Sequence, residues 1–412
     1  MSVALPLSGE PRHQACLERA LGLCVRALVR HLGDRLRAVI LTGSFARGEG
    51  TVLADARGLR ALSDLEFFVV LRGASPAARV LPACAAALEA RLAAEGLRVG
   101  VEFGPLRPGF FRRARPSIFV FDLREHGRVL WGPPDLLEAL PRFGPEAIPP
   151  EDALWLLCNR IVEQLELHER LALGAAGPAE LAYGRVKLLL DLAGSLLAFV
   201  GRHVARYAER PAAFARLVAE TPSLRAALPA DLVAEVARAA RAKVAPAAHD
   251  AWPPVDGGAA EGARLGHALR ALGPAVTAAL GWELARLLGA RGDLDALLTA
   301  YARRAPLAER VRDWARLWLT PLPPPVALAR GRALRLALRS TPRRLLYAAA
   351  ARAYRALADG HGPEADPAPG DPRAAAAALV RDLPLASTAR PVDPGAARRA
   401  IVALWRWAVR TR

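Results

Sequence analysis

Two short stretches, Val39-Ile-Leu-Thr-Gly-Ser44 and Ser63-Asp-Leu-Glu-Phe-Phe-Val-Val70, decide the fold of this chain. Each contains a run of apolar residues that is typical of a buried strand. The first run ends in Gly43-Ser44, and the second begins with Asp64 and Glu66. Because strand side chains alternate between faces, carboxylates two residues apart point the same way. Two such carboxylates repel each other unless a cation lies between them, which favours Mg²⁺.

This order of features resembles the signature of the DNA polymerase beta-like nucleotidyltransferase superfamily: an apolar strand, Gly-Ser, a spacer, and Asp-x-Asp/Glu opening a second strand. The resemblance implies transfer of a nucleotidyl group from a nucleoside triphosphate, with ATP as the expected donor, to a hydroxyl. It also implies that Asp64, Glu66 and a third carboxylate hold two Mg²⁺ ions, and that Gly43, Ser44 and Arg47 receive the triphosphate. The spacer of 19 residues between Ser44 and Asp64 is longer than the family pattern and is interpreted as a loop insertion.

Two later residues compete for the third carboxylate that the resemblance implies. Glu102 interrupts the apolar strand predicted over 97–103, and Asp122 lies similarly in a strand predicted over 117–123. Glu102 is the better match, because it is central in its strand. A solvent-facing place on a half-exposed strand is the structural alternative for either residue.

The chain is predicted to be helical from Glu151 onward, with no convincing strand. The expected fold class is therefore an α+β N-terminal nucleotidyltransferase domain, with a mixed sheet and flanking helices, followed by an all-α domain. The expected boundaries are 1–148 for the catalytic domain, 149–358 for a helical acceptor domain, and 359–412 for a linker and C-terminal helices. The Pro- and Gly-rich linker predicts that a chain lacking residues 360–412 still folds. This layout is similar to that of the antibiotic nucleotidyltransferases.

A polar stripe runs along the otherwise apolar helix predicted over 179–202. Its members recur every four residues and are Tyr183, Lys187, Asp191 and Ser195. The preceding helix presents Arg160 and Glu163 on one face. One interpretation is a packing lattice of ion pairs, Arg160 with Asp191 and Lys187 with Glu163.

The other interpretation is that this face lines the acceptor cleft. In the antibiotic nucleotidyltransferases that the layout resembles, a glutamate of the helical part is the general base for the acceptor hydroxyl. The resemblance would give this role to Glu163 and would place Lys187 in the nucleotide site. Lysine at position 187 is notable, because Lys187 and Lys243 are the only lysines among 57 basic residues. One explanation is that a compact ammonium is required there in place of a planar guanidinium.

The charge of the chain bears on its partners. The net charge is +17, and residues 301–412 hold 21 arginines against 8 acidic residues. The helices predicted over 326–357, with a break near Thr341-Pro342, could therefore offer a surface to an anionic partner. The structural alternative is a solvated basic face in a chain that is rich in arginine throughout. Nucleic acid is disfavoured, because this region lacks the interleaved aromatic residues that stack on bases.

The expected partners are a small-molecule acceptor of the sugar or aminoglycoside kind, or a protein hydroxyl, and a second copy of the chain in a homodimer. Adenylylation of a protein, as in toxin–antitoxin modules, and nucleotide addition to RNA stay open as alternative functions. No metal spacing or pairing links Cys16, Cys24, Cys84 and Cys158. Together with the lack of a signal peptide or an apolar span, this predicts a cytoplasmic protein with reduced thiols.

Overall fold

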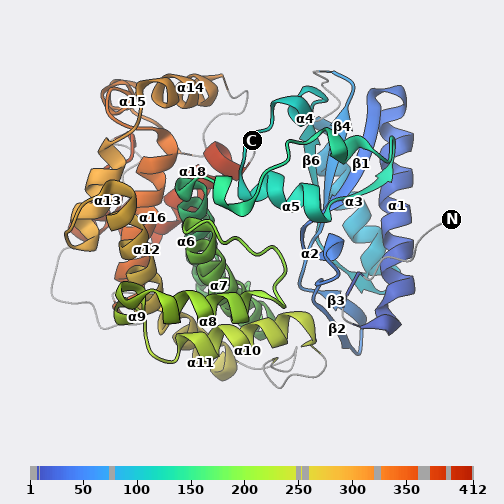
Figure 1. Ribbon diagram of the computed structural model, residues 1–412, viewed down its shortest axis with the longest axis horizontal. Helices are drawn as coiled ribbons and strands as arrows, with labels where there is room; N and C mark the ends of the chain where they lie inside the picture. Colours follow the sequence, from blue (N-terminus) through green and yellow to red (C-terminus); the bar gives the residue numbers. More distant parts are fainter. Residues whose placement is uncertain are drawn as a thin grey trace. The chain divides into compact units, whose positions relative to one another are not determined.

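The computed structural model describes residues 7–8, 10–73, 79–246, 252, 259–319, 326–360, 372–386 and 391–410. The chain divides into two compact units: the first contains 1–152, 197–215 and 233–255, and the second contains 153–196, 216–232 and 256–412. The first unit carries the strands and the second is built from helices, which confirms the predicted fold class (Figure 1). After residue 152 the chain returns to the first unit twice, which was not predicted from the sequence.

The strands of the first unit form two sheets. The larger sheet has the order β6-β4-β1-β7 and the smaller one the order β2-β3-β5. The strands are β1 Leu36–Thr42, β2 Val52–Asp55, β3 Gly58–Ala61, β4 Leu65–Leu71, β5 Leu97–Arg98, β6 Val101–Leu106 and β7 Arg128–Trp131. The strand predicted over 97–103 is thus two strands, one in each sheet. The spacer insertion is also not a loop, because β2 and β3 pair as an antiparallel hairpin.

The larger sheet buries a separate apolar core on each face. The helices of this unit that precede residue 149 are α1 Gln14–Leu32, α2 Gly43–Ala46, α3 Leu81–Ala94, α4 Gly109–Arg113 and α5 Ile118–His126. Leu41 and Phe67 pack in the core with α1 and α3, whereas Ile40 and Val70 pack in the core with α4 and α5. Because side chains alternate along a strand, Glu66 lies on the α5 face. The sequence predicts that α3 begins at Ser75, because Ser75-Pro76 is a typical helix start. Ser75 lies outside the described residues.

The strand predicted over 117–123 is wrong, because these residues form α5. Ser117 begins the helix: its side-chain oxygen accepts the Val120 N–H at 3.1 Å, a typical N-cap. The apolar run Ile-Phe-Val-Phe suits a strand equally well by composition. Burial instead falls on Val120 and Leu123, three residues apart, which is the helical period.

The remaining helices begin at residue 150. They are α6 Pro150–Ala172, α7 Pro178–Phe199, α8 Arg210–Glu220, α9 Pro222–Ala227, α10 Leu232–Val244, α11 Ala259–Arg270, α12 Gly273–Leu288, α13 Leu294–Arg303, α14 Leu307–Trp318, α15 Arg330–Ala337, α16 Pro342–Ala358, α17 Pro372–Leu379 and α18 Pro394–Trp405. α16 is buried along most of its length and contacts α12, α13 and α18, so it is the centre of the second unit. The predicted break at Thr341-Pro342 is confirmed. None of the described helices has both the length and the apolar character needed to cross a bilayer.

A carboxylic acid is fully buried where α6, α7 and α12 meet. Glu283 Oε1 lies 2.6 Å from Ser195 Oγ, which in turn lies 2.7 Å from the Ala153 carbonyl oxygen. One hydroxyl hydrogen cannot serve both acceptors, so a protonated Glu283 that donates to Ser195 gives each of these two hydrogen bonds its own hydrogen. Desolvation by burial raises the pKa of Glu283 to about 8, although the Ser195 hydrogen bond acts in the opposite direction. Glu283 is therefore mostly neutral at pH 7.

We expect Glu283 to make the stability of the second unit fall with rising pH. The folded state holds this proton more tightly than the unfolded chain, where the carboxyl pKa is 4.5. The contribution is therefore complete below pH 4.5 and is lost as the pH rises to about 8, a change on the order of 5 kcal/mol. The Glu283→Gln variant cannot ionise and should lack this slope. Urea unfolding free energies of the two proteins should diverge in the variant's favour between about pH 5 and about pH 9; parallel curves would contradict this.

Candidate active site

The Gly-Ser turn lies directly against one of the predicted metal carboxylates. Thr42, the last residue of β1, pairs with Glu66 of β4 in the antiparallel register. The next residue, Gly43, has a φ of +70°, and a Cβ built there would lie 2.5 Å from Glu66 Oε1. Only glycine fits this position, because of both the backbone conformation and the space that the carboxylate takes. The local fold therefore joins the predicted phosphate-binding turn to the predicted metal ligand.

Glu66 and Glu102 stand side by side in the larger sheet. β4 and β6 are parallel, and Glu66 is the register partner of Glu102. Paired residues of adjacent strands point to the same face, so the two carboxylates are neighbours. Asp64 precedes β4, and its carboxylate lies over Gly100, two residues before Glu102, where a Cβ would clash with it. The structure thus brings Asp64, Glu66 and Glu102 to the same end of β4 and β6.

The donor chemistry of this group fits a hard divalent cation such as Mg²⁺, because all the donors are carboxylate oxygens. Glycine at positions 43 and 100 leaves room for the carboxylates of Glu66 and Asp64. As the side chains stand, no three His, Cys, Asp or Glu residues in the described part of the chain are gathered closely enough to hold a metal ion. The assignment of these residues to Mg²⁺ therefore stays a prediction.

Asp122 has a different environment from the one predicted. It lies on α5, where Oδ1 is 2.7 Å from His203 Nε2 and Oδ2 is 3.5 Å from Arg47 Nη1. Burial opposes ionisation of Asp122, yet the His203 hydrogen bond and the Arg47 charge lower its pKa below the ordinary value. The other ring nitrogen of His203, Nδ1, is buried and has no hydrogen-bond partner among the described residues. Asp122 is thus an anchor for Arg47 rather than a strand carboxylate.

Arg47 is buried in this network instead of extending into solvent. Its Nε lies 3.4 Å from Glu49 Oε2, and its guanidinium carbon is 5.0 Å from the centre of the Tyr207 ring. Burial disfavours the charge, but Tyr207 and the carboxylates of Asp122, Glu49 and Glu66 raise the pKa of Arg47. Glu49 also accepts the backbone N–H groups of Tyr207 and Ala208 at 3.1 and 3.0 Å. Arg47 therefore adds a fixed positive charge beside Glu66.

Lys243 closes the base of the inserted hairpin. Its Nζ donates to Thr51 Oγ1 at 2.9 Å and to Ser63 Oγ at 2.8 Å, and Ser63 Oγ also accepts the Thr51 N–H at 2.9 Å. Thr51 directly precedes β2, and Ser63 lies between β3 and Asp64. These three residues, hereafter the hairpin clasp, bring the two ends of the hairpin together. The clasp explains how a long spacer still delivers Asp64 to the start of β4.

We expect the Lys243→Met variant to lose stability, because both hydroxyls then lose a buried, charged donor. Hydrogen bonds to a charged group contribute ~1.5–3 kcal/mol each, so the unfolding free energy should fall by roughly 3 kcal/mol or more. The matched control is Lys187→Met, the other lysine of the chain, which is partly exposed and should cost no more than about 1 kcal/mol. Urea denaturation of both variants measures the difference; equal losses would show that the clasp contributes little.

The predicted polar stripe forms a lattice within the second unit. Arg160 Nε donates to Asp191 Oδ2 at 2.8 Å and Arg160 also bonds Glu163, while Lys187 Nζ lies 3.7 Å from Glu163 Oε2. Both ion pairs of the packing interpretation are therefore present. Solvent exposure increases from one end of the lattice to the other. Asp191 is buried, whereas the side chains of Glu163 and Lys187 are 30% and 29% exposed. Solvent reaches its Glu163 end.

Comparison with known proteins adds little to this geometry. No protein-family model and no curated protein matches the chain. Among solved structures, a spectinomycin adenyltransferase from Enterococcus faecialis, determined with ATP and spectinomycin, aligns at 13% identity with a TM-score of 0.35. The alignment covers 61% of this chain and 99% of that one.

Several residues around the candidate site could not be assigned from the sequence. Glu49, His203, Tyr207 and Lys243 reach it from positions up to 192 residues away along the chain. Two weak signals were present. Glu49 follows Arg47 by two residues, and Lys243 is a rare lysine in an arginine-rich chain. Neither signal names a contact partner.

Proposed function

We propose that this protein is a magnesium-dependent nucleotidyltransferase that transfers a nucleoside monophosphate from a nucleoside triphosphate, with ATP as the expected donor, to a hydroxyl of a small sugar-like or aminoglycoside-like acceptor. The observation that carries the proposal is the register of Glu66 with Glu102, next to a Gly43 whose missing side chain leaves room for Glu66. Two carboxylates in register on adjacent strands repel each other, and a divalent cation bound between them would relieve that repulsion.

Each candidate site residue in the first unit has a definite role in this proposal. Asp64, Glu66 and Glu102 would hold the metal, and Gly43 and Ser44 would receive the triphosphate. Bound Mg²⁺ supplies charge neutralisation at the phosphates and lowers the pKa of the attacking oxygen. Arg47 would act beside them as a fixed cation, held by Glu49 and Asp122. Positioning and charge account for most of the catalysis in phosphoryl-type transfer, so rigid anchoring of these groups matters.

The direct test is pyrophosphate release by the full chain in the presence of Mg²⁺, each nucleoside triphosphate, and a panel of hydroxylated acceptors. The proposal expects release that depends on both the metal and a small acceptor, with the nucleotide recovered on that acceptor. Label recovered on protein or on RNA would favour one of the alternative functions. No metal-dependent release with any acceptor would end the proposal.

Glu163 is proposed as the general base for the acceptor hydroxyl, because it is the solvent-reached carboxylate of the lattice. The Glu163→Gln variant should lower turnover by roughly 10²–10⁴-fold, the usual contribution of a general base, without changing triphosphate affinity. Glu180→Gln is the matched control, since Glu180 is also a partly exposed carboxylate paired with an arginine in this unit. Unchanged turnover in Glu163→Gln, with a lower melting temperature, would favour the packing interpretation.

A further inference from the structure

Exposed apolar side chains are concentrated in one short part of the second unit. Ten large apolar side chains are exposed among the described residues, and six of them lie between 307 and 338: Leu307, Val311, Trp318, Leu319, Leu334 and Leu338. Single exposed apolar residues are ordinary on protein surfaces, but a cluster of this kind marks an interaction site.

α14 has two apolar stripes, of which one is buried and the other is exposed to solvent. Trp314 and Leu317 are buried and hold the helix to the second unit. Leu307, Val311 and Trp318 recur at helical spacing on an adjacent stripe that stays exposed. Trp318 is 55% exposed even though its ring lies 5.7 Å from the Trp314 ring. Packing within the unit therefore accounts for only one of the two stripes.

α15 contacts α14 (Figure 1). It adds a second exposed stripe, Leu334 and Leu338, one helical turn apart. Arginines border both stripes. Those exposed to solvent are Arg312, Arg316, Arg330, Arg335 and Arg339. Asp313 pairs with Arg312 at 3.0 Å, and no further acidic residue occurs in the sequence from 314 to 358. The exposed apolar residues together with these arginines are hereafter the α14–α15 surface.

We propose that the α14–α15 surface binds an anionic phospholipid bilayer. The headgroup region of such a bilayer offers phosphates to the guanidinium groups, and its acyl boundary takes up leucine and tryptophan side chains. A second copy of the chain would bring arginines against arginines, and a nucleic acid would leave the leucines without an apolar partner. A bilayer satisfies both sets of side chains at once. This inference does not depend on the proposed catalytic activity.

A cavity on the far side of α15 combines the same two kinds of side chain. It has a volume of about 240 Å³ and is lined by Arg332, Ala377, Val380, Arg381, Leu383 and Leu385. Arg332 donates to the Arg381 carbonyl oxygen and so fixes this edge of α15 to the residues that follow α17. α15 therefore presents arginine beside apolar surface on more than one side.

Co-sedimentation of the full chain with vesicles tests the proposal. The protein should bind vesicles of equal parts phosphatidylcholine and phosphatidylglycerol, should bind phosphatidylcholine alone far more weakly, and should be released by salt. The Trp318→Ser/Leu338→Ser variant should bind the anionic vesicles at least about tenfold more weakly. Removal of one arginine, as in Arg335→Gln, should weaken binding about fivefold. Brominated lipid should quench the fluorescence of the unsubstituted chain more than that of Trp318→Phe.

Leu173→Ser is the matched control, because Leu173 is 74% exposed in the same unit but lies outside the α14–α15 surface. It should bind vesicles as the unsubstituted chain does. Equal binding to both kinds of vesicle, or full binding by Trp318→Ser/Leu338→Ser, would overturn the proposal. The proposal would also be overturned if the chain bound neither kind of vesicle but bound an acidic amphipathic peptide through this surface, because the partner would then be a protein.

Discussion

The Asp64→Asn/Glu66→Gln double variant should fold normally and lose metal-dependent turnover almost completely. Both substitutions keep the shape of the side chain, so the register of β1, β4 and β6 should survive. They remove two of the three carboxylate charges that would hold Mg²⁺. Loss of a single electrostatic contact in an active site costs about 10²–10³-fold in rate, so this variant should fall by at least that much. Pyrophosphate release and calorimetric titration with Mg²⁺ measure the two effects separately.

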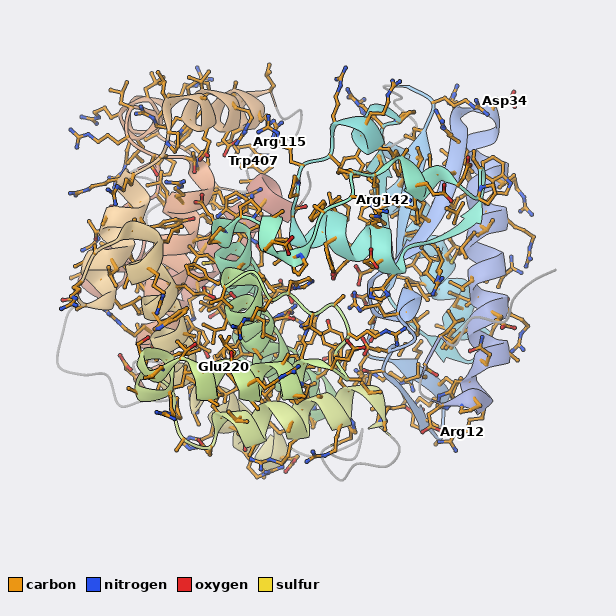
Figure 2. All side chains as sticks on the ribbon, in the orientation of Figure 1. Arg12, Asp34, Arg115, Arg142, Glu220 and Trp407 are labelled. Carbon is orange, nitrogen blue, oxygen red and sulfur yellow. The ribbon has the colours of Figure 1, made fainter. Side chains whose placement is uncertain are left out.

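Asp34→Asn is the control for this variant. Asp34, labelled in Figure 2, is an exposed carboxylate just before β1, at the end of that strand opposite to Gly43. It should keep full activity and full metal affinity. Glu102→Gln then tests the third ligand alone and should lower metal affinity without unfolding the sheet. Turnover that persists in the double variant would refute the assignment of Asp64 and Glu66 as metal ligands, whatever the result for Glu102→Gln.

Removal of residues 360–412 should unfold the second unit, contrary to the prediction from the linker composition. α18 packs against α16, and Trp405 Nε1 donates at 2.9 Å to Asn159 Oδ1, which also accepts the Tyr347 hydroxyl at 2.6 Å. Ile401 and Trp405 are buried with their neighbours on α18. Each such side chain contributes ~1.5–3 kcal/mol by burial, and several together approach the whole stability of a typical domain, ~5–15 kcal/mol. Size-exclusion chromatography and urea denaturation of the truncated chain check this.

Two neighbouring arginines make a finer test of the same packing. Arg398 and Arg399 both bind Glu169, at 2.7 and 2.9 Å, but the Arg398 side chain is buried and that of Arg399 is exposed. Arg398→Met should therefore cost roughly 3–5 kcal/mol, because it leaves a buried carboxylate short of a partner. Arg399→Met should cost at most about 1 kcal/mol. If the truncated chain folds, or if Arg398→Met and Arg399→Met lose the same unfolding free energy, the original prediction of a weakly attached C-terminal segment would be supported instead.

The part of the site that depends on local pattern was predictable from the sequence. Gly43, Asp64 and Glu66 lie at strand ends, and the alternation of apolar residues sets the face of each side chain. Glu102 was also selected as a candidate ligand, because a charge in the middle of an apolar strand is conspicuous, and its role stays a prediction. Its partner could not be known, since the register between β4 and β6 depends on how two distant strands align.

The errors have a different physical origin. The residues around Asp122 suit a strand by composition, and only the Ser117 cap and the packing of Val120 and Leu123 decide for a helix. Lys243, His203 and Glu49 act through contacts between segments more than 80 residues apart, which no local pattern contains. The C-terminal helix looked detachable because the linker composition is visible in the sequence, whereas the hydrogen bond from Trp405 to Asn159 is not.

The hairpin clasp has a consequence for the synthesis of this protein. A ribosome releases the strands of the first unit long before Lys243, so the nascent chain holds an inserted hairpin whose base is still open. The unit can reach its final form only after α10 has emerged, because contacts across such long separations form late. The N-terminal part is therefore not a cassette that could be exchanged between proteins at residue 152. A recombinant donor segment would have to bring residues 197–215 and 233–255 with it.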